Sequence, residues 1–136
     1  MADEVQRVAI AVVEQDGHYL VGTRKPNEAL AGCTEFPGGK CLPAEDGAAC
    51  AMRECREETG LDVVAVRRLY ACRHDYAYGT LDLEFWLCRP KLRRENLPAA
   101  GGGFEWLPVQ SLKSLNFPDA NRPVIGLLTA DTDSVG

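Results

Sequence analysis

The sequence predicts an α/β fold, a layered sandwich in which helices pack on a mixed β-sheet. Three features indicate this fold. Val5–Val13 is rich in valine, isoleucine and alanine, as in a largely buried strand. Residues 81–88 alternate between apolar and polar side chains, as in a strand with one buried face. Between them, an acidic stretch with helical spacing follows the double glycine Gly38-Gly39 and ends at Gly60.

The first half of the chain is predicted to form a hairpin, a polar loop and a helix. Asp16-Gly17 is typical of a hairpin turn, after which Tyr19–Thr23 returns as a second strand. A polar loop follows, up to about residue 33. The helix is expected to begin at Glu45 or Asp46, because acidic side chains suit the free N–H groups and the positive dipole of a helix start. Gly60 ends it.

The second half is predicted to contain two long strands and three shorter elements. Asp62–Tyr78 favours one strand, long enough to carry a bulge, which turns at Gly79-Thr80 into the alternating strand. Residues 89–103, with proline and a glycine triplet, predict a loop. A short strand at 105–107, a short helix at 108–115 and a closing helix at Pro123–Leu128 follow. Residues 129–136 are expected to be a frayed tail.

Length and charge limit the kinds of protein this chain can be. Its 136 residues suit one domain, 1–136, with a real core. A net charge of −5 argues against duplex nucleic acid as the main partner, since such binding needs a basic surface. The start of the chain lacks an apolar signal region, and no stretch approaches the roughly 20 apolar residues of a membrane span. We therefore expect a cytoplasmic protein with neither a membrane nor duplex nucleic acid as partner. A small anionic substrate stays possible, and both a monomer and a homodimer stay open.

The sequence contains six cysteines. None belongs to a C-x-x-C pair, and no histidine lies at the spacing of a zinc finger. We therefore predict free thiols in a reducing compartment, mostly as small core residues, rather than a structural zinc site.

The acidic helix carries the chemistry. Glu54, Glu57 and Glu58 are spaced i, i+3 and i+4, so their carboxylates project from one side of a helix. Clustered carboxylates repel one another unless a cation such as Mg²⁺, which prefers oxygen ligands, joins them. The alternative is a solvated acidic face with ordinary Glu–Arg pairs. That alternative does not explain the double glycine ahead of the helix, or Arg53, which is placed to hold a neighbouring carboxylate.

The stretch from Gly39 to Leu61 resembles the Nudix box, G-x5-E-x7-R-E-U-x-E-E-x-G-U, in which U is aliphatic. The matching positions are Gly39, Glu45, Arg53, Glu54, Glu57, Glu58, Gly60 and Leu61. Cys55 departs from the pattern, because a larger aliphatic residue is usual there. The resemblance implies a Nudix-type α/β/α sandwich over almost the whole chain. It also implies hydrolysis of a nucleoside diphosphate linked to another group, with Mg²⁺ or Mn²⁺ as cofactor.

The same resemblance implies roles for the box residues. Glu57 and Glu58 match metal ligands, and the backbone carbonyl of Gly38 often adds another oxygen. Glu54 matches the residue that orients or deprotonates the attacking water, directly or as a metal ligand. Arg53 would hold Glu54 in place.

Two further residues of the box have open roles. Glu45 is implied to support the ligands without touching the metal. Lys40 either meets a phosphate as a point charge or is an ordinary solvated lysine.

Outside the box, the chain resembles the MutT-like branch of the family, which removes oxidised guanine nucleotides. The matching segments are residues 35–40, 85–86, 105–106, 117–118, 120–121 and 123–125. This implies that Asn121 hydrogen-bonds the purine base, although Asn before Pro-Val-Ile is also good helix-capping chemistry. Arg24 is implied to contact a phosphate or the sugar. Phe36 either lines the nucleoside pocket or belongs to the core.

Two departures from this branch concern the metal and the substrate. The branch has a fourth metal-binding glutamate near the position of Ala100, where this chain has no carboxylate. Glu95 or Glu105 would have to substitute. The branch also has an Asp-Arg pair where this chain has Tyr78-Gly79.

The resemblance implies Mg²⁺-dependent hydrolysis of a (d)NTP, above all 8-oxo-dGTP, to the monophosphate and pyrophosphate. A cytidine nucleotide pyrophosphatase is the alternative within the family; a close subfamily there carries Asp at the position of Asn121. Another nucleoside diphosphate-X hydrolase is a further option. A non-catalytic Nudix-like binding module is opposed by the intact Arg53, Glu54, Glu57 and Glu58.

Overall fold

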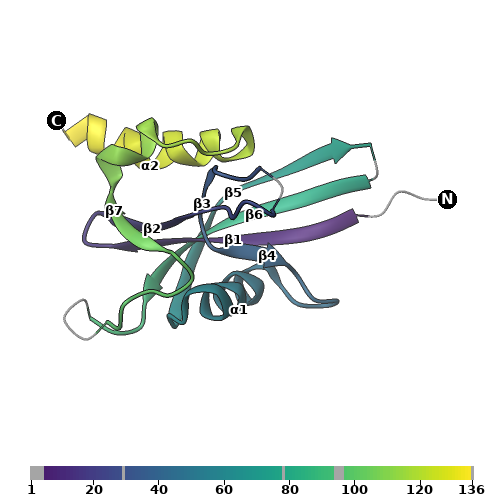
Figure 1. The fold of residues 1–136 in the computed structure, drawn as a ribbon, viewed down its shortest axis with the longest axis horizontal. Coiled ribbons are helices and arrows are strands. Elements are labelled where there is room, and N and C mark those ends of the chain that lie inside the picture. Colours follow the sequence, from purple (N-terminus) through teal and green to yellow (C-terminus); the bar gives the residue numbers. More distant parts are fainter. Residues whose placement is uncertain (1–4, 29, 78, 94–96, 136) are drawn as a thin grey trace.

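The computed structural model describes residues 5–28, 30–77, 79–93 and 97–135 (Figure 1). Within these residues the elements follow in the order β1 (Val5–Gln15), β2 (His18–Thr23), β3 (Thr34–Glu35), β4 (Gly38–Lys40), α1 (Gly47–Thr59), β5 (Val63–Tyr76), β6 (Gly79–Pro90), β7 (Glu105–Pro108), the 3-10 helices η2 (Val109–Ser114) and η3 (Asp119–Asn121), and α2 (Arg122–Val135).

The sheet is mixed, as predicted, with the strand order β3-β2-β1-β6-β5. The central strands β1 and β6 run parallel, from Val5 opposite Thr80 to Val13 opposite Cys88. The other pairings between described strands are antiparallel. Because β1 has partners on both edges and helices on both faces, almost its whole length can be apolar.

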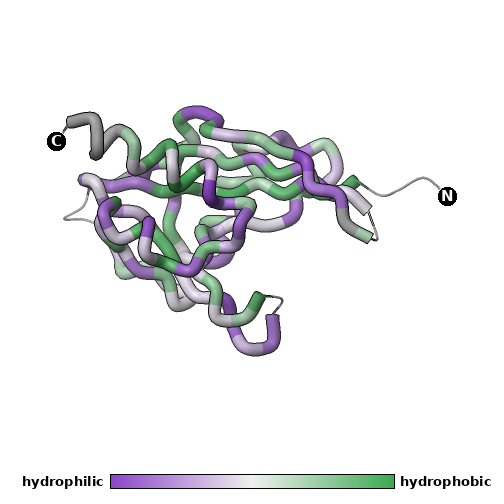
Figure 2. Tube along the Cα trace, turned by 90° about the horizontal axis from the view of Figure 1, so that it is seen from above, coloured by the Kyte–Doolittle hydropathy of each residue, from purple (hydrophilic) through white to green (hydrophobic). Residues whose placement is uncertain are grey.

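Helix α1 covers one face of the sheet and α2 covers the other (Figure 1). Side chains of β1 alternate between two cores: Ala11 and Val13 pack with Cys50 of α1, whereas Val12 packs with Val124 of α2. Hydrophobic residues are distributed over much of the described chain and are interrupted by short hydrophilic stretches (Figure 2). The α/β/α sandwich that the resemblance implied is therefore confirmed.

The divergence of β1 from β2 positions the double glycine. These two strands pair next to their turn, where Glu14–Gln15 lies opposite His18–Tyr19. Along His18–Val21, β2 also pairs with β7, and its last residues, Gly22 and Thr23, pair with β3 rather than with β1. The edge that β1 leaves open is taken by β4, with Gly38 opposite Ile10. The glycines thus lie against the central strand, close to α1.

Several strand boundaries differ from the prediction. The turn expected at Gly79-Thr80 lies earlier, because Tyr76 pairs with Gly79 and β6 begins there. Tyr78, expected to end the preceding strand, lies outside the described residues. The long strand β5 has the bulge that its length suggested, with register irregularities near Ala65 and Arg68. The strands β3 and β4 have two and three residues, too few to show an apolar period in the sequence.

The helices also differ in extent. Of the two predicted starts for α1, Asp46 is its N-cap. The predicted short helix at 108–115 is the 3-10 helix η2. The closing helix is longer than predicted: α2 continues to Val135, through most of the expected frayed tail. In the described part of the chain, no helix combines the length and the apolar character needed to cross a membrane.

Candidate active site

The ends of α1 explain why this stretch forms a helix of one defined length. The Asp46 carboxylate accepts a hydrogen bond of 2.7 Å from the Ala49 N–H, which satisfies a free donor of the first turn. Gly60 ends the helix in the left-handed region, at φ 81°, and its N–H donates to the Arg56 carbonyl at 2.9 Å. With both ends set, the glutamates of α1 have a fixed position relative to β4.

The double glycine is required because two elements approach it closely. A side chain on Gly39 would overlap the carboxylate of Glu54. A Cβ on Gly38 would lie 2.7 Å from the Ala9 carbonyl oxygen and 2.8 Å from the Ile10 Cα of β1. Glycine therefore lets β4 fit between the central strand and the glutamate-bearing face of α1.

Arg53 connects the predicted site residues. Its Nε and Nη2 donate to the two oxygens of Glu45 at 2.8 and 3.0 Å. Its Nη1 donates to Glu54 at 3.0 Å and to Glu57 at 3.1 Å. Its Nη2 also donates to the backbone carbonyl of Lys40 at 3.0 Å. One guanidinium thus holds two carboxylates of α1 against the turn that leads into the helix.

The charges of this network stabilise each other. Hydrogen bonds from Arg53, together with one from the Leu42 N–H, lower the pKa of the Glu45 carboxyl to about 2. The same contacts raise the pKa of Arg53. Glu45 therefore stays ionised at neutral pH and anchors Arg53.

Glu58 lies in a different environment. Burial, together with the nearby charges of Glu35 and Glu54, raises the pKa of its carboxyl to about 8. A hydrogen bond with the Gly38 backbone opposes this rise. The carboxylates of Glu35, Glu54 and Glu58 therefore lie close together without enough positive charge to balance them. A bound cation would relieve their repulsion.

Glu35 is a residue that the sequence analysis named only as part of the segment 35–40. Burial raises the pKa of its carboxyl, while the ion pair with Arg24, at 3.0 Å, lowers it. Its influence on Glu58 places it at the junction between Arg24 and the glutamates of α1. The sequence feature that could have indicated Glu35 as a site residue is its position in the same segment as Gly38.

The three predicted substrate contacts line one pocket of about 210 Å³, together with Glu35 and Gly38. Arg24 pairs there with Glu35. Phe36 is buried, and its ring stacks on Phe117 at a centroid distance of 4.8 Å, so Phe36 is part of the core.

The side chain of Asn121 makes a hydrogen bond: its Nδ2 donates to the Pro118 carbonyl at 3.2 Å. This bond lies within η3 and is not the predicted cap of α2. Its Oδ1 and second N–H remain the groups that can meet a base.

Two predicted residues have weaker support from the geometry. The exposed side chain of Lys40 makes no hydrogen bond or ion pair within the described residues, and it is its carbonyl that holds Arg53. Glu105 is exposed at the start of β7, opposite Val21. Across the described ranges it makes no hydrogen bond or ion pair with α1. The other substitute for the missing carboxylate, Glu95, lies outside the described residues.

The loop without this carboxylate lies at the end of α1. The Gly101 N–H donates to the Thr59 carbonyl at 2.8 Å, and Ala100 packs on the apolar core on that side of the sheet. Among the described residues, Glu54, Glu57 and Glu58 do not form a ready cluster of metal-ligand atoms. The Glu57 side chain is 58% exposed and is held by Arg53, so it must turn to share a cation with Glu58.

A comparison with protein families matches residues 8–127 to the family described as NUDIX domain. The chain belongs to the Nudix family. It is therefore a hydrolase, as predicted, and Nudix hydrolases use divalent metal ions.

Curated relatives of this Nudix hydrolase include two enzymes of Escherichia coli strain K12. An 8-oxo-dGTP diphosphatase is 28% identical over 123 residues, which cover 90% of this chain and 95% of the relative. A CTP pyrophosphohydrolase is 30% identical over 79 residues, 58% of each chain. A third relative, an 8-oxo-dGTP diphosphatase of Buchnera aphidicola subsp. Schizaphis graminum, is 29% identical over 84% of this chain and 85% of its own.

Solved structures share the Nudix fold. The solution structure of the MutT protein of methicillin-resistant Staphylococcus aureus 252 superposes with a TM-score of 0.72 at 26% identity, covering 96% of this chain and 99% of that one. The ORF135 protein of E. coli gives the same TM-score at 24% identity and covers 96% and 91% of the two chains. The second likeness shows the fold alone.

Proposed function

We propose that this Nudix hydrolase is a Mg²⁺-dependent nucleoside triphosphate pyrophosphohydrolase. Its favoured substrate is 8-oxo-dGTP, which it cleaves to the monophosphate and pyrophosphate in cytoplasmic nucleotide-pool sanitation. The observation that carries the proposal is the pocket that extends from Asn121 and Arg24 to Gly38 and Gly39, next to the glutamates of α1. A nucleoside bound at the Asn121 end would direct its phosphates toward those carboxylates.

The residues at the phosphate end fit a hard divalent cation. Their donors are oxygens: the carboxylates of Glu54, Glu57 and Glu58, and the carbonyl of Gly38. The raised pKa of Glu58 indicates that this group lacks compensating positive charge. When bound, Mg²⁺, or Mn²⁺ in its place, neutralises phosphate charge and orients the substrate. Glu105 stays a proposed fourth ligand, which its exposed position on β7 does not favour.

Glu54 is assigned to the attacking water, which it orients or deprotonates, directly or as a metal ligand. One oxygen of Glu54 accepts a hydrogen bond from Arg53 at 3.0 Å, and its carboxylate lies against Gly39, so the side chain has little freedom to turn. Arg53 is a positioning residue, which Glu45 holds by a forked pair. Lys40, exposed on β4, is assigned to a phosphate oxygen as a mobile point charge.

The base end is assigned to Asn121, with Arg24 on the sugar or phosphate and Phe36 forming the apolar wall. An amide presents a donor to the O6 of 8-oxoguanine and an acceptor to its N7–H. Arg24 is already paired with Glu35 and lies 3.9 Å from a Glu28 oxygen, so it reaches the substrate only with part of its guanidinium.

CTP hydrolysis is the second candidate. The similarity to a CTP pyrophosphohydrolase over 79 residues supports it. Asn121 argues for the purine, because the cytidine subfamily carries Asp at this position.

The test of the proposed chemistry is Glu54→Gln. The variant keeps the size of the side chain and one oxygen that can accept from Arg53, but loses the charge and the basicity. We expect turnover of nucleoside triphosphates to fall by about 10²- to 10⁴-fold, the range for a lost general base, with an unchanged melting temperature. Glu14→Gln, which breaks a surface ion pair with Arg89, is the matched control and should keep full turnover. Unchanged turnover in Glu54→Gln would refute the assignment.

A further inference from the structure

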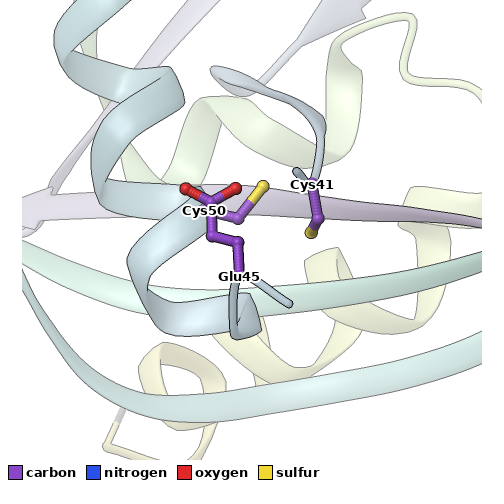
Figure 3. A group of neighbouring side chains, drawn as sticks. All are labelled: Cys41, Glu45 and Cys50. Atoms are coloured by element: carbon purple, nitrogen blue, oxygen red, sulfur yellow. The ribbon is translucent and has the colours of Figure 1, made fainter. Parts of the chain in front are cut away.

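Three side chains outside the proposed Mg²⁺ ligands converge at the start of α1. They are Cys41, directly after β4, Glu45 in the following loop, and Cys50 in the first turn of the helix (Figure 3). Each offers one donor atom, and these three atoms all lie within 4.8 Å of one another. The sequence spacing, three and then four intervening residues, matches no zinc-finger pattern, which is why the sequence argued against a zinc site.

The donor set decides which metal fits. Two thiol sulfurs and one carboxylate oxygen suit Zn²⁺, which binds sulfur at about 2.3 Å and oxygen at about 2.0–2.2 Å. They do not suit Mg²⁺, which prefers oxygen ligands alone. We propose that Cys41, Glu45 and Cys50 form a Zn²⁺ site, separate from the Mg²⁺ site of the α1 glutamates.

The three ligands are supported by the surrounding backbone, as a metal site requires. The Cys41 N–H donates to the Arg7 carbonyl of β1 at 2.8 Å. The Leu42 N–H donates to Glu45 at 2.9 Å. Cys50 is fully buried, and its N–H donates to the Asp46 carbonyl at 2.9 Å. The three donor atoms lie within 4.8 Å of one another, so they already face one shared position.

Cys41 and Glu45 leave the fourth position open to solvent. Both are half-buried, whereas Cys50 forms the floor of the site. A zinc ion can therefore enter from the side of the loop, and a water molecule would complete its tetrahedral coordination.

The charge balance also favours a divalent ion. Two thiolates and one carboxylate carry three negative charges, and Zn²⁺ neutralises two of them. The third is matched by Arg53, whose Nη2 lies 3.0 Å from Glu45 and 3.9 Å from the Cys50 sulfur. Arg53 thus touches both the zinc site and Glu54, so an ion in this site lies beside the catalytic helix.

The experiment uses the full chain, kept reduced with a phosphine and supplied with excess Mg²⁺. Co²⁺ is added as a spectroscopic substitute for Zn²⁺, and Zn²⁺ binding is then measured by competition. The variants are Cys41→Ser and Cys50→Ala, with Cys33→Ser as the control, because Cys33 is also a half-buried free thiol but lies outside the group. Circular dichroism and the melting temperature establish that each variant is folded.

We expect the unmodified protein to show a thiolate-to-cobalt charge-transfer band that one equivalent of Zn²⁺ abolishes. Cys41→Ser and Cys50→Ala should lower Zn²⁺ affinity by more than about tenfold, since even residues that only support metal ligands cost 10- to 100-fold. Cys33→Ser should bind as before. The proposal fails if no thiolate band forms, if the band survives Cys41→Ser, or if the two thiols are instead found as a disulfide that excludes the metal. Glu54→Gln, which leaves these ligands intact, should keep the band, so the zinc site is tested independently of catalysis.

Discussion

The carboxylate of Glu54 occupies the space that a side chain on Gly39 would fill. This contact ties the catalytic helix to the edge of the sheet at one point, because Gly39 lies in β4 and β4 pairs with the central strand β1. The same carboxylate is held from the other side by Arg53 at 3.0 Å. The position of Glu54 is thus set by a missing side chain and by one guanidinium.

Replacement of this glycine should damage catalysis more than folding. In Gly39→Ala, the added methyl group must displace Glu54, and we expect kcat to fall at least about tenfold with little change in KM. Gly47→Ala is the matched control, since its methyl group would meet the carboxylate of Glu84 and the indole of Trp86, away from the site. It should change the melting temperature but not kcat. Equal effects of the two substitutions on kcat would contradict this role of Gly39.

Arg53→Lys keeps the charge but cannot reproduce the fork on Glu45 together with the contacts to Glu54 and Glu57. Steady-state kinetics should show turnover lower by about 10- to 100-fold, the cost typical of residues that orient metal ligands. Arg73→Lys is the control, because Arg73 makes a similar forked pair with Asp82 on the surface, at 2.7 and 2.9 Å. It should have normal kinetics. Wild-type turnover in Arg53→Lys would show that the fork is dispensable.

The base contact is tested by Asn121→Asp. The carboxylate keeps the shape of the amide but repels the O6 of 8-oxoguanine. We expect kcat/KM for 8-oxo-dGTP to fall by roughly 5- to 150-fold, which corresponds to about 1–3 kcal/mol for one buried hydrogen bond. Hydrolysis of CTP should change little. Asn116→Asp, at an exposed amide near Cys33, is the control. A uniform loss for all nucleotides would mean that Asn121 acts through the fold of η3 instead.

The half-buried Glu58 should make the metal-free protein less stable as the pH rises. Its pKa is raised from 4.5 to about 8 in the folded state, so folding retains a proton that the unfolded chain has lost. Stability should therefore decrease between about pH 4.5 and 8 and level off above that range. Urea unfolding in a chelator, with Glu58→Gln as the reference, measures this contribution. If both proteins show the same pH dependence, Glu58 does not retain its proton in the folded state.

The catalytic helix could be predicted from the sequence because its information is local. Asp46, Gly60 and the spacing of Glu54, Glu57 and Glu58 are all contained in one short segment, where helical geometry decides which side chains meet. The strands β3 and β4 could not be predicted, because residues 34–35 and 38–40 form strands through their partners, not through a period of their own.

The parts of the site that depend on tertiary packing also could not be predicted from the sequence. The fold brings Glu58 close to Glu35, although the two residues lie about twenty positions apart in the sequence. Likewise, Cys41 and Cys50 meet because the loop after β4 folds back onto the first turn of α1. The roles assigned to the site residues, Lys40 and Glu105 among them, stay predictions.

The central claim is that this site hydrolyses nucleoside triphosphates to the monophosphate and pyrophosphate, with 8-oxo-dGTP preferred. The most direct measurement compares Mg²⁺-dependent hydrolysis of 8-oxo-dGTP, dGTP, CTP, dCTP, 5-hydroxy-dCTP and ADP-ribose at low substrate concentration, with pyrophosphate and phosphate assayed separately. The account predicts the highest kcat/KM for 8-oxo-dGTP, with pyrophosphate as the product. A preference for cytidine nucleotides or ADP-ribose, or release of phosphate alone, would contradict it.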